Sequence, residues 1–324
     1  MTYALRFHRL AVPKPWAGST LAKLFPNGAS DWPAGTGESI EVADLPGEST
    51  RIANGKWRDL TLGQAIAQDR LSFLGQLAGA DDLPDFPLAI KLLDTRQPLS
   101  IQDHPRDEFH KGRRIHRGKS EGWLVLKAEP GAVIYQGLKP GLQRADFEDA
   151  LRNNRADQSM NARPVAAGDW LYNPAGMVHA LGAGLTLLEI QQNTGVTWRL
   201  WDFPRPGGLR RDLHLKEGLA AADFETAPPQ IFKAADGTLL HDAGPFGVKS
   251  LRFSQPRQLA RSWAGFTLVT CLQGRCEVTL RGSDRLEPAC LDAPDTILAP
   301  AAFTDFEFYP QGECRLILSW ARAS

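Results

Sequence analysis

The sequence predicts an all-β protein built as a sandwich or barrel. Its 30 glycines and 23 prolines separate many short apolar segments. Several segments alternate apolar and polar residues, the pattern of strands with one buried face. Helical spacing is confined to a few stretches. Many short strands divided by turn residues are typical of sandwiches and barrels.

The individual elements follow from these patterns. In the first two thirds of the chain the strand candidates are 88–93, 99–104, 122–127, 132–136, 185–192 and 197–201. A second series follows at 247–253, 265–282, 295–300 and 313–321. Two segments have helical spacing of apolar residues, an amphipathic one at 61–78 and a shorter one at 144–154.

A change of composition divides the chain. Residues 220–235 are rich in Ala, Pro and Asp, so we expect one domain at 1–225 and a C-terminal β domain at 226–324. Segment 167–181 aligns with 293–308, which places Asp305 at the position of His179. In the same way 121–126 aligns with 265–270, with Gly265 opposite Glu121. A duplicated fold explains this echo, and chance similarity of two hairpins is the alternative.

Charge and composition exclude several classes of function. Thirty-seven basic and 37 acidic residues give zero net charge, so no overall field attracts nucleic acid or an anionic membrane. No segment resembles a signal peptide or reaches the length of a membrane span, and we expect a soluble, cytoplasmic protein. The four cysteines (Cys271, Cys276, Cys290 and Cys314) fit no zinc-knuckle spacing, and we expect free thiols.

The strongest local signal is Gly168-x5-Pro174-x-Gly176-x2-His179. The glycines allow sharp turns, and the proline fixes the approach to the strand that carries the histidine. This stretch resembles the second motif of the cupin superfamily, small antiparallel jelly-roll barrels that hold a metal. We therefore expect a cupin jelly-roll barrel with a small helical insertion and a second, smaller cupin-like domain.

Further metal ligands are expected on neighbouring strands. In "LSIQDHP" (99–105), Gln102 and His104 stand two residues apart and share a strand face, and Glu121 begins the next strand. Together with His179 they offer nitrogen and oxygen donors that suit Zn²⁺, with Mn²⁺, Co²⁺ or Fe²⁺ also accommodated. Taken singly, His179 could be a structural histidine and Glu121 a surface charge.

A basic loop lies between these candidates. His110 and His116 stand in "RDEFHKGRRIHRGK", and we do not expect them to be ligands. The loop either attracts an anion or is a solvated segment.

Four segments together resemble type I mannose-6-phosphate isomerases, in the short bacterial branch of that family. They are 37–55, 87–105, 118–137 and 165–203, within a likeness that covers about residues 10–215. The resemblance implies the metal ligands Gln102, His104, Glu121 and His179. It also implies sugar-phosphate contacts from Lys91, Lys119 and Ser100, a catalytic Arg199, and an acidic pocket residue at Glu189.

Two positions depart from the family pattern. Gly195 stands where the family usually has an aspartate four residues before the arginine, and Ile40 replaces a tryptophan in "GESIEV". Without that aspartate, either another residue carries the proton or the substrate differs from that of the family. Glu189 is a carrier if burial raises its pKa toward neutrality, and Lys119 is one if a metal lowers its own. A structural Glu189 paired with Arg199 is the alternative.

The resemblance implies an isomerase that interconverts mannose 6-phosphate and fructose 6-phosphate through an enediolate, as a monomer or homodimer. A divalent ion and the fixed charge of Arg199 would stabilise the enediolate oxygens. A non-catalytic sugar-phosphate binder is one alternative. An Fe²⁺-dependent oxygenase is another, although its sites typically use three histidines with or without a glutamate.

Overall fold

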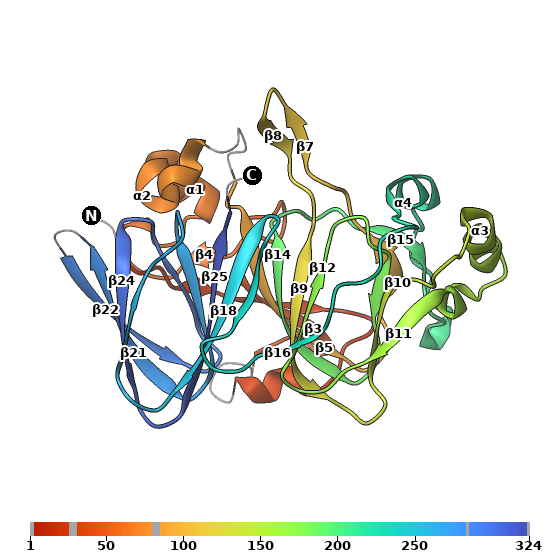
Figure 1. Cartoon of the computed structure of the whole chain (residues 1–324). Coiled ribbons are helices and arrows are strands. Elements are labelled where there is room, and N and C mark those ends of the chain that lie inside the picture. Colours follow the sequence, from red (N-terminus) through yellow and green to blue (C-terminus); the bar gives the residue numbers. More distant parts are fainter. Residues whose placement is uncertain (1–2, 26–30, 80–84, 283–284, 323–324) are drawn as a thin grey trace.

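Two β-sandwiches lie side by side in the computed structural model, which describes residues 3–25, 31–79, 85–282 and 285–322 (Figure 1). The first sandwich pairs a seven-stranded sheet with a five-stranded sheet, and the second pairs a five-stranded sheet with a four-stranded one. Strand pairs within these sheets are antiparallel. The predicted all-β cupin architecture is confirmed.

The strands of the first sandwich have the following order. The seven-stranded sheet runs β16 (Phe232–Lys233), β12 (Asp169–Asn173), β9 (Glu121–Ala128), β14 (Leu185–Gln192), β5 (Leu88–Thr95), β3 (Thr36–Val42), β2 (Leu10–Pro13). The five-stranded sheet runs β11 (Met160–Pro164), β10 (Val133–Leu138), β13 (His179–Leu181), β6 (Ile101–Asp103), β15 (Trp198–Trp201).

The second sandwich repeats this order. Its sheets run β17 (Leu239–Ala243), β18 (Phe246–Phe253), β25 (Cys314–Ala321), β20 (Thr267–Gln273), β23 (Thr296–Ala299), and β19 (Arg257–Ala260), β24 (Phe303–Pro310), β21 (Arg275–Gly282), β22 (Arg285–Asp292). The order β12-β9-β14-β5-β3 thus matches β23-β20-β25-β18-β17, and β11-β10-β13-β6 matches β22-β21-β24-β19. The folds of the two halves therefore echo each other as their sequences do.

Helices and two short pairs of strands lie outside the four large sheets. The helices are α1 (Leu62–Gln68), α2 (Arg70–Leu74), α3 (Arg144–Arg152) and α4 (Leu215–Ala221), with 3₁₀ turns at Leu21–Leu24, Gly55–Trp57, Gly75–Gly79, Ala156–Ser159 and Pro206–Gly208. Strand β1 (Phe7–His8) pairs with β4 (Arg51–Ile52), and β7 (Glu108–His110) pairs with β8 (Arg113–His116).

The helical segment expected at 61–78 is broken in two. The Thr61 hydroxyl and the Gln64 side chain form a capping box at the start of α1. Asp69 then leaves helical geometry (φ −154°, ψ 59°), and its carboxylate accepts a 3.4 Å hydrogen bond from the Ser72 backbone N–H. Aspartate prefers this capping position, so α2 begins anew after it.

The seven-stranded sheet separates the main core from the site. On one face Leu88, Ile90 and Leu188 join a core shared with the second sandwich. The rings of Phe86 and Phe266 there lie 4.4 Å apart, which joins the two sandwiches directly. The opposite face of the seven-stranded sheet faces the interior of the first sandwich. Strands β5 and β14 are buried at every residue because both of their faces are covered.

The structure also bears on membrane-spanning segments and on the state of the cysteines. No helix among the described residues is long and apolar enough to cross a membrane. The four cysteines carry free thiols, three of them buried and Cys290 exposed.

Candidate metal centre and substrate cavity

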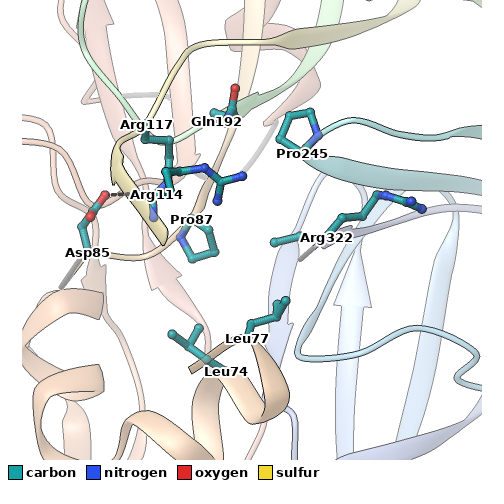
Figure 2. Close-up of a pocket in the computed structure, with 10 residues that line it drawn as sticks. Leu74, Leu77, Asp85, Pro87, Arg114, Arg117, Gln192, Pro245 and Arg322 are labelled. Carbon is teal, nitrogen blue, oxygen red and sulfur yellow. Dashed lines mark hydrogen bonds and ion pairs between the residues drawn. The ribbon is translucent and has the colours of Figure 1, made fainter. Parts of the chain in front are cut away.

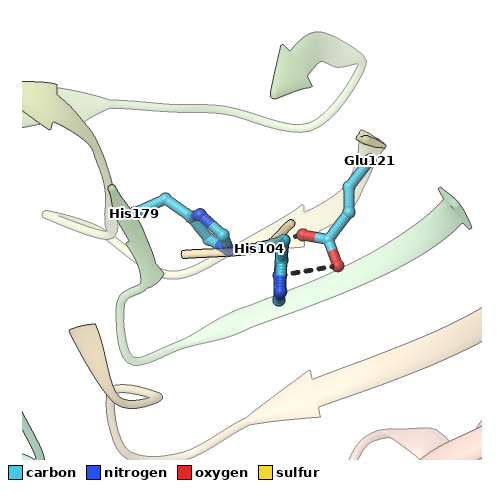
Figure 3. Close-up of side chains that lie close together, drawn as sticks. All are labelled: His104, Glu121 and His179. Carbon is cyan, nitrogen blue, oxygen red and sulfur yellow. Dashed lines mark ion pairs between the residues drawn. The ribbon is translucent and has the colours of Figure 1, made fainter. Parts of the chain in front are cut away.

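Three of the four predicted metal ligands converge inside the first sandwich. His104 Nε2 lies 3.3 Å from Glu121 Oε1, and His179 Nε2 lies 3.3 Å from Glu121 Oε2. The three ligand atoms lie within 4.8 Å of one another, and all three residues are buried (Figure 3). His179 begins β13, Glu121 begins β9, and His104 follows β6, so three strands of two sheets bring them together. His110 and His116 take no part in this cluster.

Both imidazoles are oriented by backbone carbonyls. The Nδ1–H of His104 donates to the carbonyl of Val196 at 3.0 Å, and that of His179 donates to the carbonyl of Met177 at 2.9 Å. Each Nε2 therefore keeps its lone pair toward the centre of the cluster. Within the described structure His104 Nε2 is buried and makes no hydrogen bond. Such an orphaned acceptor beside a carboxylate fits a bound divalent metal.

Gln102 completes the rim of this cluster. Its Nε2 lies 3.4 Å from His179 Nε2, and its Oε1 accepts a 3.0 Å hydrogen bond from Ser100 Oγ. A Gln102 that ligates a metal through Oε1 would have to turn its amide around. The structure thus brings all four predicted ligands into one place, with the amide oxygen facing Ser100.

Charges around the cluster favour the forms that bind metal. Burial, together with the nearby charge of Lys119, lowers the pKa of His104 to about 3, so the imidazole is neutral. Burial opposes ionisation of Glu121, but the charge of Lys119 holds the pKa of that carboxyl well below its ordinary value. Lys119 Nζ lies 2.7 Å from Glu121 Oε1. Neutral imidazoles and an ionised carboxylate are the metal-ligating forms.

A polar cavity of about 200 Å³ adjoins the cluster. Six of the residues predicted for the site line it: Lys91, Ser100, Gln102, Lys119, Glu189 and Arg199. Gly195 lines it too, and a Cβ at that position would meet no atom within 4 Å. The cavity therefore has open space where the family pattern places a carboxylate.

Glu189 faces this cavity from β14. It lies opposite Trp123 in the sheet, and Trp123 Nε1 donates a 2.9 Å hydrogen bond to Glu189 Oε2. Burial and the negative charge of Glu121 raise the pKa of Glu189 to about 7. Among the described residues the Glu189 carboxyl is hydrogen-bonded to this indole and forms no ion pair with Arg199.

Arg199 enters the cavity from β15. Its Nε donates to Ser100 Oγ at 3.3 Å, and its Nη1 donates to the carbonyl of Asp212 at 2.7 Å. Burial lowers its pKa from the ordinary value, but a guanidinium stays charged at neutral pH. Ser100 thus links Arg199 to Gln102.

The cavity is also lined by residues that the sequence did not single out, among them Lys14, Trp16, Glu38, Glu48 and Arg211. Glu38 Oε2 lies 3.2 Å from Lys14 Nζ and 3.5 Å from Lys91 Nζ. Although burial lowers the pKa of Lys91, the carboxylate of Glu38 raises it above the ordinary value. Glu38 stands two residues before Ile40 in "GESIEV", where Ser39 and Glu41 are polar too, so no local pattern distinguished it. Lys14 and Arg211 lie in loops without any pattern.

Comparisons with known proteins agree with this geometry. No family model matches the chain. A mannose-6-phosphate isomerase of Streptococcus mutans is 29% identical over 314 residues, covering 94% of each chain. One from Bacillus subtilis is 28% identical over 325 residues, covering 97% of this chain and 98% of its own. The crystal structure of a mannose 6-phosphate isomerase from Bacillus subtilis superposes with a TM-score of 0.80 at 24% identity, covering 98% of this chain and 100% of that one. The chain is therefore similar to the mannose-6-phosphate isomerases over nearly its whole length.

Proposed function

We propose that this protein is a metal-dependent aldose–ketose isomerase that interconverts mannose 6-phosphate and fructose 6-phosphate. The observation that carries the proposal is the buried His104–Glu121–His179 cluster beside a cavity lined by Glu189 and Arg199. The homologues named mannose-6-phosphate isomerase support the same activity.

His104, Glu121 and His179 would hold one divalent cation, with Gln102 as a fourth ligand. Two imidazole nitrogens with carboxylate and amide oxygens suit Zn²⁺, and Mn²⁺, Co²⁺ or Fe²⁺ are alternatives. When bound, the cation supplies Lewis acidity for the two adjacent oxygens that become negative as the aldose passes to the ketose.

Glu189 is the proton carrier in this proposal. Isomerisation removes the proton from C2 of the aldose and returns it to C1, so one group must act as base and then as acid. A pKa of about 7 suits a carboxyl to both roles near neutral pH. The Trp123 indole holds the carboxyl in place by its hydrogen bond to Oε2.

Arg199 stabilises developing negative charge without taking up or releasing a proton. Its guanidinium is fixed by Ser100 Oγ and the Asp212 carbonyl before substrate arrives, so little reorganisation is needed. The ammonium groups of Lys14, Lys91 and Lys119 add positive charge for the phosphate and hydroxyl groups of the sugar. Lys91 and Lys14 share the carboxylate of Glu38, and Lys119 that of Glu121.

The remaining assignments belong to the same proposal. Residues 1–225 form the catalytic domain, and 226–324 form a C-terminal β domain without metal ligands. The protein is cytoplasmic, acts on a small hexose phosphate, and is a monomer or homodimer.

A coupled assay tests the activity. Chelator-treated protein is reloaded with Zn²⁺ and incubated with mannose 6-phosphate, and fructose 6-phosphate formation is measured. The proposal predicts turnover that depends on metal. Binding of the sugar phosphate, seen as thermal stabilisation, without any ketose would instead identify a non-catalytic binder, which the open space at Gly195 favours.

A further inference from the structure

The chain between His104 and Glu121 makes an excursion away from the site. It forms the β7–β8 hairpin, which projects from the molecule (Figure 1), and every residue of β7 is exposed. His104 stands just before the outgoing arm, and Lys119 and Glu121 follow the returning arm. The spacing of these site residues therefore depends on contacts at the base of the excursion.

The two arms meet closely at that base. The Lys119 N–H donates to the carbonyl of Pro105 at 3.0 Å. A Cβ built at Gly118 would lie 2.6 Å from the Asp107 nitrogen and 2.8 Å from the Pro105 oxygen. Backbone atoms cannot yield as a flexible side chain can, so only glycine allows this approach.

The carboxylate of Asp107 joins the two arms. Its Oδ1 accepts hydrogen bonds from the Gly118 N–H at 2.7 Å and from Gln192 Nε2 at 2.8 Å. Its Oδ2 lies 3.1 Å from Arg114 Nη2 on β8. One side chain on the outgoing arm thus contacts the returning arm, the hairpin and the end of β14.

Gln192 passes this constraint to the site. The side-chain Oε1 of Gln192 accepts a hydrogen bond from the Ser120 backbone N–H at 2.9 Å. The backbone N–H of Gln192 donates to the Ser120 carbonyl at 3.1 Å. Asp107 fixes which way the Gln192 amide faces, because only the amide nitrogen can donate to a carboxylate. Ser120 stands between Lys119 and Glu121, whose side chains meet at 2.7 Å.

We propose that Asp107 is a positioning residue, which acts through Gln192 and Ser120 to hold Lys119 and Glu121 at the metal cluster. The inference rests on the proposed function for its effect on turnover. Its effect on metal binding does not depend on which reaction the site performs. Groups behind the ligands that orient them typically change metal affinity or activity by about 10- to 100-fold.

A neighbouring carboxylate offers a matched control. Asp85 pairs with Arg117 and accepts a 3.2 Å hydrogen bond from Asn193 Nδ2, so it too neutralises a buried arginine and contacts an amide. Figure 2 shows this pair beside Arg114 and Gln192, facing Pro245 and Arg322 of the second sandwich. Within the described part of the chain Asp85, unlike Asp107, makes no hydrogen bond to the backbone of Gly118 or Ser120.

The experiment compares Asp107→Asn with Asp85→Asn and the wild type. Zn²⁺ affinity is measured by competition with a chromogenic chelator, the visible spectrum is recorded after loading with Co²⁺, and kcat and KM are measured on mannose 6-phosphate. We expect Asp107→Asn to bind Zn²⁺ about tenfold more weakly and to lose about tenfold in kcat, with an altered Co²⁺ spectrum and little change in KM. Gln192→Met, which leaves the Asp107–Arg114 pair intact, should act in the same direction.

The outcomes separate positioning from general stability. If both aspartate variants weaken Zn²⁺ binding equally, or if Asp107→Asn and Gln192→Met bind Zn²⁺ as the wild type does, Asp107 does not position the site. If Asp107→Asn does not fold, Gln192→Met alone decides. If the wild type binds Zn²⁺ but forms no ketose, the proposed function fails, and the Zn²⁺ affinities still decide the role of Asp107.

Discussion

Trp123 Nε1 donates a 2.9 Å hydrogen bond to the carboxyl of Glu189, which faces the same cavity as Arg199. Burial and the charge of Glu121 raise the pKa of this carboxyl to about 7. The bond to the indole opposes that rise, because it stabilises the ionised form. Two neighbouring residues thus set the proton affinity of the proposed carrier.

The pH dependence of turnover tests the role of Glu189. The base must be ionised, so kcat/KM should rise with pH and level off above about 7. Glu189→Gln cannot take up a proton, and kcat should fall by about 10²- to 10⁴-fold. Steady-state kinetics from about pH 5 to 9, a range that spans the nearly neutral pKa, check the pH profile and the fall in kcat. Wild-type kcat in Glu189→Gln would assign proton transfer to another group, such as Lys119.

Trp123→Phe changes the same titration without removing the carboxyl. Loss of the indole donor removes stabilisation of the ionised form, so the rising limb should move to higher pH. The plateau should be reduced less than in Glu189→Gln, since the carrier is still present. A limb that stays in place or moves to lower pH would contradict this account of the Trp123–Glu189 bond.

His104 and His179 should both be required for metal binding. His104→Ala and His179→Ala each remove one imidazole and leave the other beside Glu121, so bound metal should be lost after dialysis. Elemental analysis of the purified variants measures this. His110→Ala, in the projecting hairpin, is the control and should retain metal. Full metal content in His179→Ala would exclude it as a ligand.

Arg199 is expected to affect chemistry and not metal binding. Its guanidinium contacts Ser100 and the Asp212 carbonyl and is not part of the metal cluster. Arg199→Ala should therefore keep its metal and lose about 10²- to 10³-fold in kcat, the usual cost of removing a preorganised donor. Kinetics on metal-analysed protein test this, and an unchanged kcat would refute the role.

Asp103 lies between two proposed ligands but points away from them. Its carboxyl is buried, and neither oxygen has a hydrogen-bond partner among the described residues. Replacing it by valine in β6 should stabilise the fold by about 1–3 kcal/mol, the usual cost of an unsatisfied buried polar group. Thermal unfolding measures the change. A lower melting temperature in Asp103→Val would indicate a partner for Asp103 that this account lacks.

Strand β14 was predictable because both of its faces are buried. Its apolar residues occupy both faces, with Leu185 and Leu187 on one and Leu188 and Ile190 on the other, and the predicted and observed bounds coincide. The helical segment 61–78 was less predictable, since apolar spacing continues through Asp69 while the aspartate caps a new helix. The cap at Asp69, and not the spacing of apolar residues, therefore sets the boundary between α1 and α2.

The candidate site could be predicted only where residues carry a pattern. Gln102, His104 and His179 stand in recognisable spacings, and the structure brings them together with Glu121. Lys14 and Arg211 reach the cavity from loops, where no periodicity indicates direction. Asp107 lies in the basic loop, and its contacts with Gly118 and Gln192 depend on long-range folding that no local pattern encodes.

Anomalous X-ray diffraction at the zinc edge, on crystals of the Zn²⁺-loaded protein, tests the central claim most directly. We predict one strong peak between His104 Nε2, His179 Nε2 and the Glu121 carboxylate, at about 2.0–2.2 Å from each. A loaded crystal with zinc bound elsewhere and no peak at this position would contradict the account.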